Sequence, residues 1–208
     1  MSNVLIFDYD GVIADSLEIF MEKVISACIK HGSNQVNTKE DFLNLFNDNL
    51  YVSLIERGIS KETIPKLIED FQIGLKEQKK IKLFNEIKEM LVKLSKHNKI
   101  IIITSNVTKV VEESLKLKNI DCFEEVIGAD KETSKVKKIE SIKSRYKDND
   151  YFYIGDTKGD VIEGRKAKVK TIAVTWGWHS EEKLKEEKPD FIVHNPQELV
   201  DLFEKPKD

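Results

Sequence analysis

The chain has 208 residues, of which 40% are hydrophobic and 34% charged, so it can bury the core of one ordinary domain or of a domain with a small appended one. Acidic and basic residues are interleaved, the net charge is only −3, and no basic block stands out. This composition is that of a soluble globular protein, and it excludes a nucleic-acid partner bound through a strongly basic surface.

The small numbers of arginines and cysteines limit the kinds of site that this chain can form. Only three of the 34 basic residues are arginines, so binding of phosphate would fall mainly to lysine, backbone N–H groups or a metal. Cys28 and Cys122 belong to no zinc or CxxC pattern, and we expect both to be reduced core residues. No segment approaches a membrane-spanning length, and Asp8 interrupts the N-terminal apolar run, so we expect a cytoplasmic protein without a membrane partner.

Short apolar runs alternate with amphipathic helical patterns along most of the chain. The runs are continuously apolar, which is typical of strands buried on both faces of a parallel sheet. We predict strands at Val4–Asp8, Ile100–Thr104, Glu125–Ile127, Tyr151–Ile154, Thr171–Val174 and Phe191–Val193. Helices are predicted over Phe84–His97, Thr108–Lys118 and Val136–Tyr146, with a short one from Asp160. This alternation predicts an α/β fold with a doubly wound parallel sheet.

One region departs from the alternation. Between about Ser16 and Lys82 the sequence has helical periodicity and no strand candidate, and this segment is far longer than an ordinary crossover. We therefore expect an all-helical subdomain at 16–82, inserted into a core domain formed by 1–15 and 83–208. Loops that leave the carboxyl ends of parallel strands border the ligand crevice, so the insert should lie over that crevice.

Two pairs of acidic residues follow predicted strands. Asp8 and Asp10 end the first strand, and residues i and i+2 of a strand point to the same side. Asp156 and Asp160 follow the strand that ends at Ile154. In a doubly wound sheet these two strand ends can be neighbours. Gathered carboxylates repel one another unless a cation lies between them, and hard oxygen ligands suit Mg²⁺. The pattern therefore predicts a magnesium site.

Two more polar segments fit the same crevice. The run of isoleucines at 100–103 ends in Thr104, Ser105 and Asn106, which bring hydroxyls and an amide to a third strand end. Lys135 stands just before a predicted helix, where its ammonium could face the crevice.

Taken together, these segments resemble the haloacid dehalogenase superfamily, in its phosphatase branch with a helical cap, the branch of phosphoglycolate phosphatase and β-phosphoglucomutase. Four motifs match in order and span nearly the whole chain: the DYDGV that contains Asp8 and Asp10, the apolar strand that ends in TSN, a lysine before a helix, and GDTKGD. Any one of them alone is weak evidence, whereas the ordered set is specific.

The resemblance implies roles for the four acids. Asp8 would be the nucleophile that forms an aspartyl-phosphate intermediate, and Asp10 would be the general acid and then the general base. The Asp8 carboxylate, the Asp10 carbonyl and the Asp156 carboxylate would hold Mg²⁺, with Asp160 supporting it directly or through water. Since true dehalogenases lack the second acid, Asp10 favours a phosphate ester as substrate.

The resemblance also implies phosphate ligands. Ser105 would hydrogen-bond a phosphoryl oxygen beside Asn106, with Thr104 as the competing hydroxyl. Lys135 would neutralise the transferring group and restrain the nucleophile. This branch often has proline after that lysine, whereas Val136 follows here, so two other lysines remain open for the role: Lys131 and Lys137.

The function that follows is that of a Mg²⁺-dependent phosphatase of a small phosphorylated metabolite, similar to phosphoglycolate phosphatase, whose cap closes over the site. Its physiological substrate and its state as monomer or homodimer stay open. A phosphomutase of the β-phosphoglucomutase type would share all four motifs. From another class, a phospho-accepting regulatory domain would carry its aspartate after a later strand and no helical insert, and a non-catalytic binding protein is disfavoured by the intact acids.

Two further groups of residues border the expected crevice. The run from Trp176 to His179 follows the fifth strand, and we expect both tryptophans to pack an exposed loop. Four residues of the insert could reach substrate, although we expect them to be helix-surface residues: Asn47, Asn49, Tyr51 and Arg57.

Overall fold

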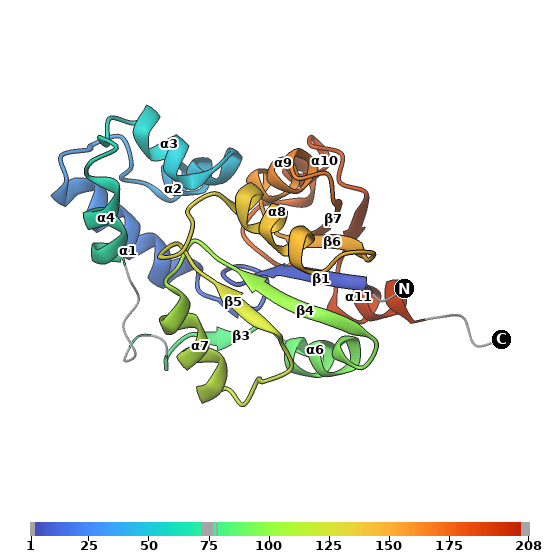
Figure 1. The fold of residues 1–208 in the computed structure, drawn as a ribbon. Coiled ribbons are helices and arrows are strands. Elements are labelled where there is room, and N and C mark those ends of the chain that lie inside the picture. The colour runs from blue at the N-terminus through green and yellow to red at the C-terminus, as the bar shows by residue number, and fades with distance from the viewer. Residues whose placement is uncertain (1–2, 72–76, 78, 205–208) are drawn as a thin grey trace.

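The computed structural model describes residues 3–71, 77 and 79–204, and its centre is a six-stranded sheet in the order β5-β4-β1-β6-β7-β8 (Figure 1). Every neighbouring pair of strands in this sheet is parallel. The strands are β1 (Asn3–Asp8), β4 (Asn98–Ile103), β5 (Glu125–Ile127), β6 (Asp150–Gly155), β7 (Lys170–Val174) and β8 (Phe191–Val193). The predicted doubly wound sheet is confirmed. Because β1 lies between β4 and β6, the three segments predicted to form the site end side by side.

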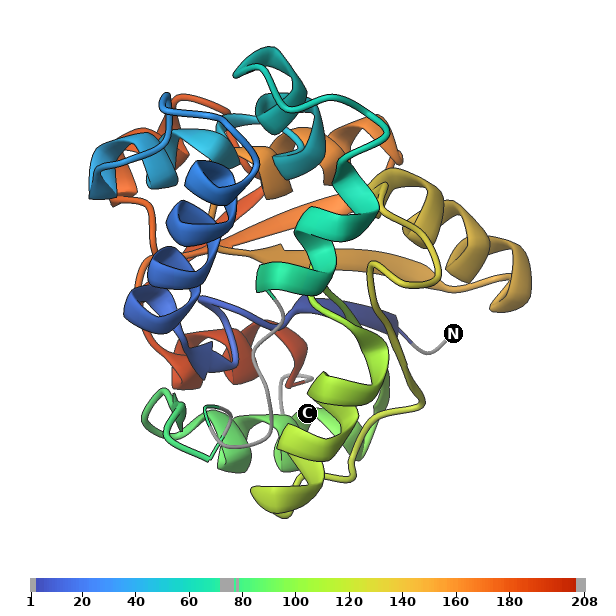
Figure 2. The same ribbon diagram turned by 90° about the vertical axis from the view of Figure 1, so that its left-hand side faces the viewer.

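Helices cover both faces of the sheet (Figures 1 and 2). Alternate residues of β1 face opposite ways, so Leu5 and Phe7 join one apolar cluster while Val4 and Ile6 join the other. The helices α6 (Ile87–Ser95), α7 (Thr108–Leu117) and α11 (Pro196–Phe203) supply the first cluster, and α8 (Lys135–Arg145) supplies the second. Two more helices, α9 (Lys158–Lys166) and α10 (Glu181–Lys185), pack near β7.

The insert after β1 is helical, as predicted. It contains α1 (Leu17–Lys30), α2 (Lys39–Asn44), the 3₁₀ turn η1 (Leu45–Asn47), α3 (Leu50–Glu56) and α4 (Ile64–Phe71). Phe20, Phe42 and Phe71 form its apolar centre, with Phe20 edge-on to both other rings. In Figure 2 these helices lie together beside the carboxyl end of the sheet.

Some boundaries differ from those expected. The chain enters and leaves the insert through a short antiparallel pair, β2 (Ala14–Asp15) and β3 (Lys82–Leu83), which was not predicted because two-residue strands have no periodicity. The helix expected from Asp160 begins at Lys158, since the Thr157 hydroxyl accepts from the Asp160 N–H and the Asp160 carboxylate caps in return. Cys122 is half-buried, not a core residue, whereas Cys28 is fully buried.

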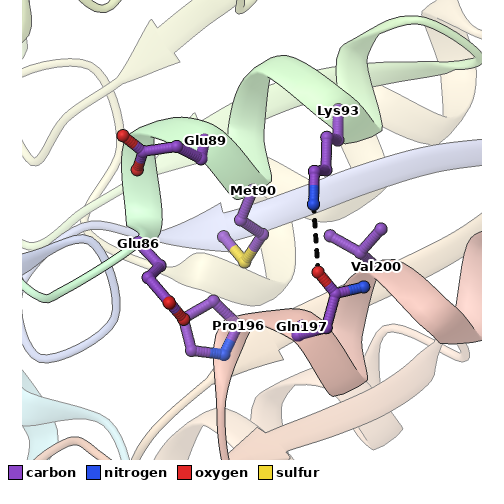
Figure 3. A pocket seen from close by; sticks show the side chains of 7 residues that line it. All are labelled: Glu86, Glu89, Met90, Lys93, Pro196, Gln197 and Val200. Atoms are coloured by element: carbon purple, nitrogen blue, oxygen red, sulfur yellow. Dashed lines mark hydrogen bonds between the residues drawn. The ribbon is translucent and has the colours of Figure 1, made fainter.

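A cavity of about 320 Å³ lies between α6 and α11 (Figure 3). Its lining includes Lys93, whose Nζ donates to Gln197 Oε1 at 3.0 Å, and it contains none of the residues predicted for the site. Within the described ranges, no helix has the length and apolar character needed to cross a bilayer.

Candidate active site

Asp8 ends β1 at the middle of the sheet, and Asp10 follows in the turn. The backbone N–H groups of Ile13 and Ala14 both donate to the Tyr9 carbonyl at 2.9 Å, which closes this turn directly after the strand. Asp8 and Asp10 are only 7% and 6% exposed, so both carboxyl groups lie in a largely dry environment. Asp8 Oδ1 accepts from the Tyr9 N–H at 2.8 Å.

Asp156, directly after β6, and Asp160, in the first turn of α9, reach the same point. Carboxylate oxygens of Asp8, Asp156 and Asp160 lie within 4.8 Å of one another, and all three residues are buried. The structure thus brings together three of the four acids that the sequence pointed to. The fourth, Asp10, accepts from the Ser16 hydroxyl at 2.7 Å and lies 3.4 Å from the Thr104 hydroxyl.

Lys135 supplies positive charge to this cluster. It is the first residue of α8, and its Nζ lies 2.7 Å from Asp8 Oδ2 and 2.6 Å from Asp160 Oδ1. Its side chain is buried, whereas its rivals Lys131 and Lys137 are exposed. Of the three lysines that the sequence left open, Lys135 is therefore the one in contact with the acids.

Burial and charge shift the titration of these groups in different directions. Burial raises the pKa of Asp8 to about 7 against the opposing pull of Lys135, and it raises the pKa of Asp156 well above its ordinary value. Burial alone would raise the pKa of Asp160 as well, but Lys135 and hydrogen bonds lower it. Burial opposes the charge on Lys135, yet Asp160 and Asp8 raise its pKa well above the ordinary value.

Asp160 is saturated by protein donors. Its Oδ1 accepts from Lys135 Nζ and from the Tyr153 hydroxyl, both at 2.6 Å. Its Oδ2 accepts from the Thr157 hydroxyl and from the N–H groups of Asp156 and Thr157. We therefore expect Asp160 to orient Lys135 more than to bind a cation directly. The sequence did not single out Tyr153, although a hydroxyl inside a buried strand is a signal that could have been used.

The cluster fits a divalent cation. Asp156 Oδ2 accepts from the Trp178 N–H at 2.7 Å, while Asp156 Oδ1 is buried with no hydrogen-bond partner in the described part of the chain. Three carboxylates face one ammonium, so the ionised cluster carries excess negative charge that a cation would offset. Gly11, at φ +83°, leaves room for this arrangement, because a Cβ there would lie 2.1 Å from Asp156 Oδ2.

The third strand end brings a hydroxyl and an amide close to the acids. Thr104 Oγ1 accepts from the Asn106 N–H at 3.0 Å and points its proton toward Asp10. Asn106 is buried, and its Nδ2 has no partner among the described residues. Ser105 is half-buried, and its carbonyl accepts from the Tyr51 hydroxyl at 2.9 Å.

We expect Ser105→Ala to lower kcat/KM for a phosphate ester roughly tenfold or more, because the predicted charge-assisted hydrogen bond from its hydroxyl to a phosphoryl oxygen would be lost. Thr104→Val is the matched variant, since it also removes one hydroxyl at the same strand end. Steady-state kinetics of the two variants would measure the loss of kcat/KM caused by each substitution. A kcat/KM of Ser105→Ala close to wild type would contradict the phosphate-binding role of Ser105. A loss in Thr104→Val alone would not assign that role to Thr104, because the Thr104 hydroxyl also faces Asp10 and accepts from the Asn106 N–H.

The helical insert contacts the core next to the site. Besides the bond from Tyr51 to Ser105, Asn49 Nδ2 donates to Glu163 Oε1 at 2.8 Å. The expectation that Tyr51 is a helix-surface residue is wrong, because its side chain is 5% exposed at this contact. The expectation of an exposed loop is likewise wrong for Trp178, which is 8% exposed. These contacts join residues that are far apart in the sequence, so no local sequence pattern predicts them.

Comparisons with known proteins identify the family and the fold of this chain. The profile of the family described as haloacid dehalogenase-like hydrolase matches residues 5–174. Pyrophosphatase PpaX of Bacillus mycoides is 24% identical over 212 residues, covering 97% of this chain and 96% of its own length. Two solved structures show the same fold. A haloacid dehalogenase-like hydrolase of Streptococcus pneumoniae has a TM-score of 0.76 at 23% identity, covering 98% and 99% of the two chains. A predicted phosphatase of Clostridium acetobutylicum has a TM-score of 0.80 at 24% identity, covering 97% and 98%.

The family match covers most of the chain, and its ends enclose every acid of the buried cluster together with Lys135. The chain belongs to the haloacid dehalogenase-like hydrolase family.

Proposed function

We propose that this hydrolase is a Mg²⁺-dependent phosphatase that acts on a small phosphorylated metabolite through an aspartyl-phosphate intermediate on Asp8. The observation that carries the proposal is the buried Asp8 carboxylate at the end of β1, which lies 2.7 Å from the ammonium of Lys135 and within 4.8 Å of an Asp156 carboxylate oxygen. Phosphoryl transfer needs an in-line nucleophile and compensation of charge, and in this proposal the Asp8 carboxylate serves as the first while the Lys135 ammonium provides the second.

In the proposed reaction, an Asp8 oxygen attacks phosphorus while Asp10 gives its proton to the leaving oxygen. Burial raises the pKa of Asp10 to about 6, so a fraction of this carboxyl group keeps its proton near neutral pH. Asp10 then takes a proton from the water that hydrolyses the acyl phosphate. Lys135 holds the Asp8 carboxylate and offsets charge on the phosphoryl group. A bound Mg²⁺, held by Asp8, Asp156 and the Asp10 carbonyl, would supply further charge compensation.

We propose that residues 16–82 act as a cap over a core of residues 1–15 and 83–208. The contacts of Asn49 and Tyr51 with the core support this division, because they seat the insert beside the strand end that carries Ser105. A seated cap would exclude water from the cluster, and substrate would enter when it lifts.

Two classes of substrate deserve a direct comparison. Phosphate monoesters are the first, in line with the proton-donating role of Asp10. Pyrophosphate is the second, because relatives that match nearly the whole chain are named pyrophosphatases. A phosphomutase of the β-phosphoglucomutase type would instead require a catalytic trace of a sugar bisphosphate and would release little phosphate.

The experiment that tests the proposal measures phosphate release from a panel of sugar phosphates, phosphoglycolate, other small monoesters and pyrophosphate. We expect turnover with Mg²⁺ and a loss of roughly a hundredfold or more after treatment with EDTA, restored by added Mg²⁺, because the buried carboxylates are then left without their counter-charge. Full activity in EDTA would contradict the metal requirement. Absence of phosphate release from the whole panel would contradict the proposed function.

A further inference from the structure

The segment after β7, from Trp176 to His179, lies directly against the predicted metal ligand Asp156. Besides the bond from the Trp178 N–H to Asp156 Oδ2, the His179 N–H donates to the Asp156 carbonyl at 3.3 Å. A Cβ at Gly177 would lie 2.3 Å from the Cβ of Asp156, so only glycine lets the backbone approach this closely. The segment therefore decides which Asp156 oxygen is engaged and which is left free.

The Trp178 side chain comes from the core domain but packs against the aromatic rings of the insert. Its ring centroid lies 4.8 Å from that of Phe46, 5.4 Å from that of Phe42 and 5.8 Å from that of Phe20. The indole Nε1 is buried without a hydrogen-bond partner in the described ranges, so packing against these three rings is what holds the indole.

His179 makes the second link to the insert. Its Nδ1 lies 3.1 Å from the Lys158 backbone nitrogen, which can only donate, so Nδ1 accepts. The imidazole proton is therefore on Nε2, which donates to the Leu43 carbonyl of α2 at 3.0 Å. With 2% of its surface exposed, the imidazole bridges the start of α9 and the insert.

We infer that Trp178 and His179 are positioning residues that couple seating of the insert to the orientation of the Asp156 carboxylate. The inference rests on the proposed function, in which Asp156 binds the metal. If the insert moves away, the indole loses its aromatic neighbours and the imidazole loses the Leu43 carbonyl, so the segment shifts or exposes apolar surface. Because the Trp178 N–H holds Asp156 Oδ2, such a shift changes the orientation of the Asp156 carboxylate.

Coupling between two events is reciprocal. If a seated insert favours the metal-binding orientation of Asp156, then bound Mg²⁺ must favour the seated insert by the same factor. This requirement separates coupling from a purely structural role, which would change the stability of the insert without changing its response to the metal.

Two substitutions of one residue test the inference. The side-chain oxygen of His179→Asn can replace Nδ1 and accept from the Lys158 N–H, but its shorter side chain places no donor at the position of Nε2, which serves Leu43. The amide of His179→Gln can replace Nε2 and donate to Leu43. Hydrogen exchange at the amides of residues 39–56 reports seating of the insert, and calorimetric titration of the metal-free protein with Mg²⁺ reports the metal site.

We expect His179→Asn to weaken Mg²⁺ binding and to reduce the slowing of exchange that Mg²⁺ causes at these amides, both by a common factor of roughly fivefold or more, and His179→Gln to stay close to wild type. Trp178→Leu provides a second arm if His179→Asn does not fold, because it keeps the backbone N–H on Asp156 and removes only the ring. It should also shift both measurements together.

The inference is overturned if neither quantity changes, or if exchange of the insert rises while the affinity for Mg²⁺ stays the same. Failure of the proposed function looks different. The wild-type enzyme would then release no phosphate from the substrate panel, whereas the joint shift in exchange and Mg²⁺ affinity needs no turnover to be observed.

Discussion

Asp8→Asn is expected to lower the turnover of p-nitrophenyl phosphate by roughly a thousandfold or more, because an amide cannot form the proposed aspartyl-phosphate intermediate. The substitution keeps the size of the side chain and its place at the end of β1, between Lys135 and Asp156. Initial rates with saturating Mg²⁺ would measure the effect. Turnover near the wild-type rate would refute the assignment of Asp8 as nucleophile.

A stability measurement guards against loss of activity through unfolding. Burial raises the pKa of Asp8 to about 7, so the folded state favours the protonated carboxyl group. The stability that this group contributes is therefore full below its unfolded-state pKa and is lost as the pH rises through about 7. The neutral amide of Asp8→Asn avoids this loss. At about pH 8 without metal, the variant should therefore melt at the wild-type temperature or above it. A clearly lower melting temperature would mean that the substitution damages the fold.

The sheet and the convergence of acids could be predicted because both follow from local pattern. Continuous apolar runs identified β1, β4 and β6, and parallel strands place their carboxyl ends at one edge. The sequence could not show which acids have a free oxygen for a cation and which are held by protein donors. Asp8 and Asp156 each have an oxygen that is not held by a side-chain donor, whereas the partners of Asp160 come from three separate segments.

Contacts between the insert and the core were beyond the reach of sequence patterns. Lys138 shows the same limit inside the core. It lies on α8 in a lysine-rich stretch that suggests a solvated face, yet it is 1% exposed, and its Nζ donates to the Thr104 carbonyl at 2.6 Å. Burial lowers its pKa to about 7. Helical periodicity cannot distinguish a buried lysine that has a partner from an exposed one, because the partner of Lys138 lies in a distant part of the sequence, directly after β4.

Lys135→Ala is expected to cost both stability and activity. The ammonium pairs with Asp8 and Asp160 in a buried setting, and removal of one partner leaves charge uncompensated. Such a loss costs about 3–5 kcal/mol, which for a chain of this size lowers the melting temperature by roughly 6–20 °C. We also expect kcat to fall roughly a hundredfold or more, since in the proposed reaction Lys135 offsets charge on the phosphoryl group.

Lys131→Ala and Lys137→Ala are the matched controls, because both lysines are exposed in the same stretch of the chain. Their melting temperatures and rates should stay close to wild type, and a larger rate loss in either would show that the active-site lysine is misassigned.

Added Mg²⁺ separates the two roles of Lys135, which are to balance the charge of the acids and to contact the transferring group in the proposed reaction. A divalent ion between the carboxylates of Asp8 and Asp156 can replace the missing charge, so it should raise the melting temperature of Lys135→Ala more than that of wild type. The ion cannot supply the proposed contact of Nζ with the transferring group. Turnover should therefore stay low even when stability recovers, whereas recovery of both would reduce Lys135 to a counter-ion of the acids.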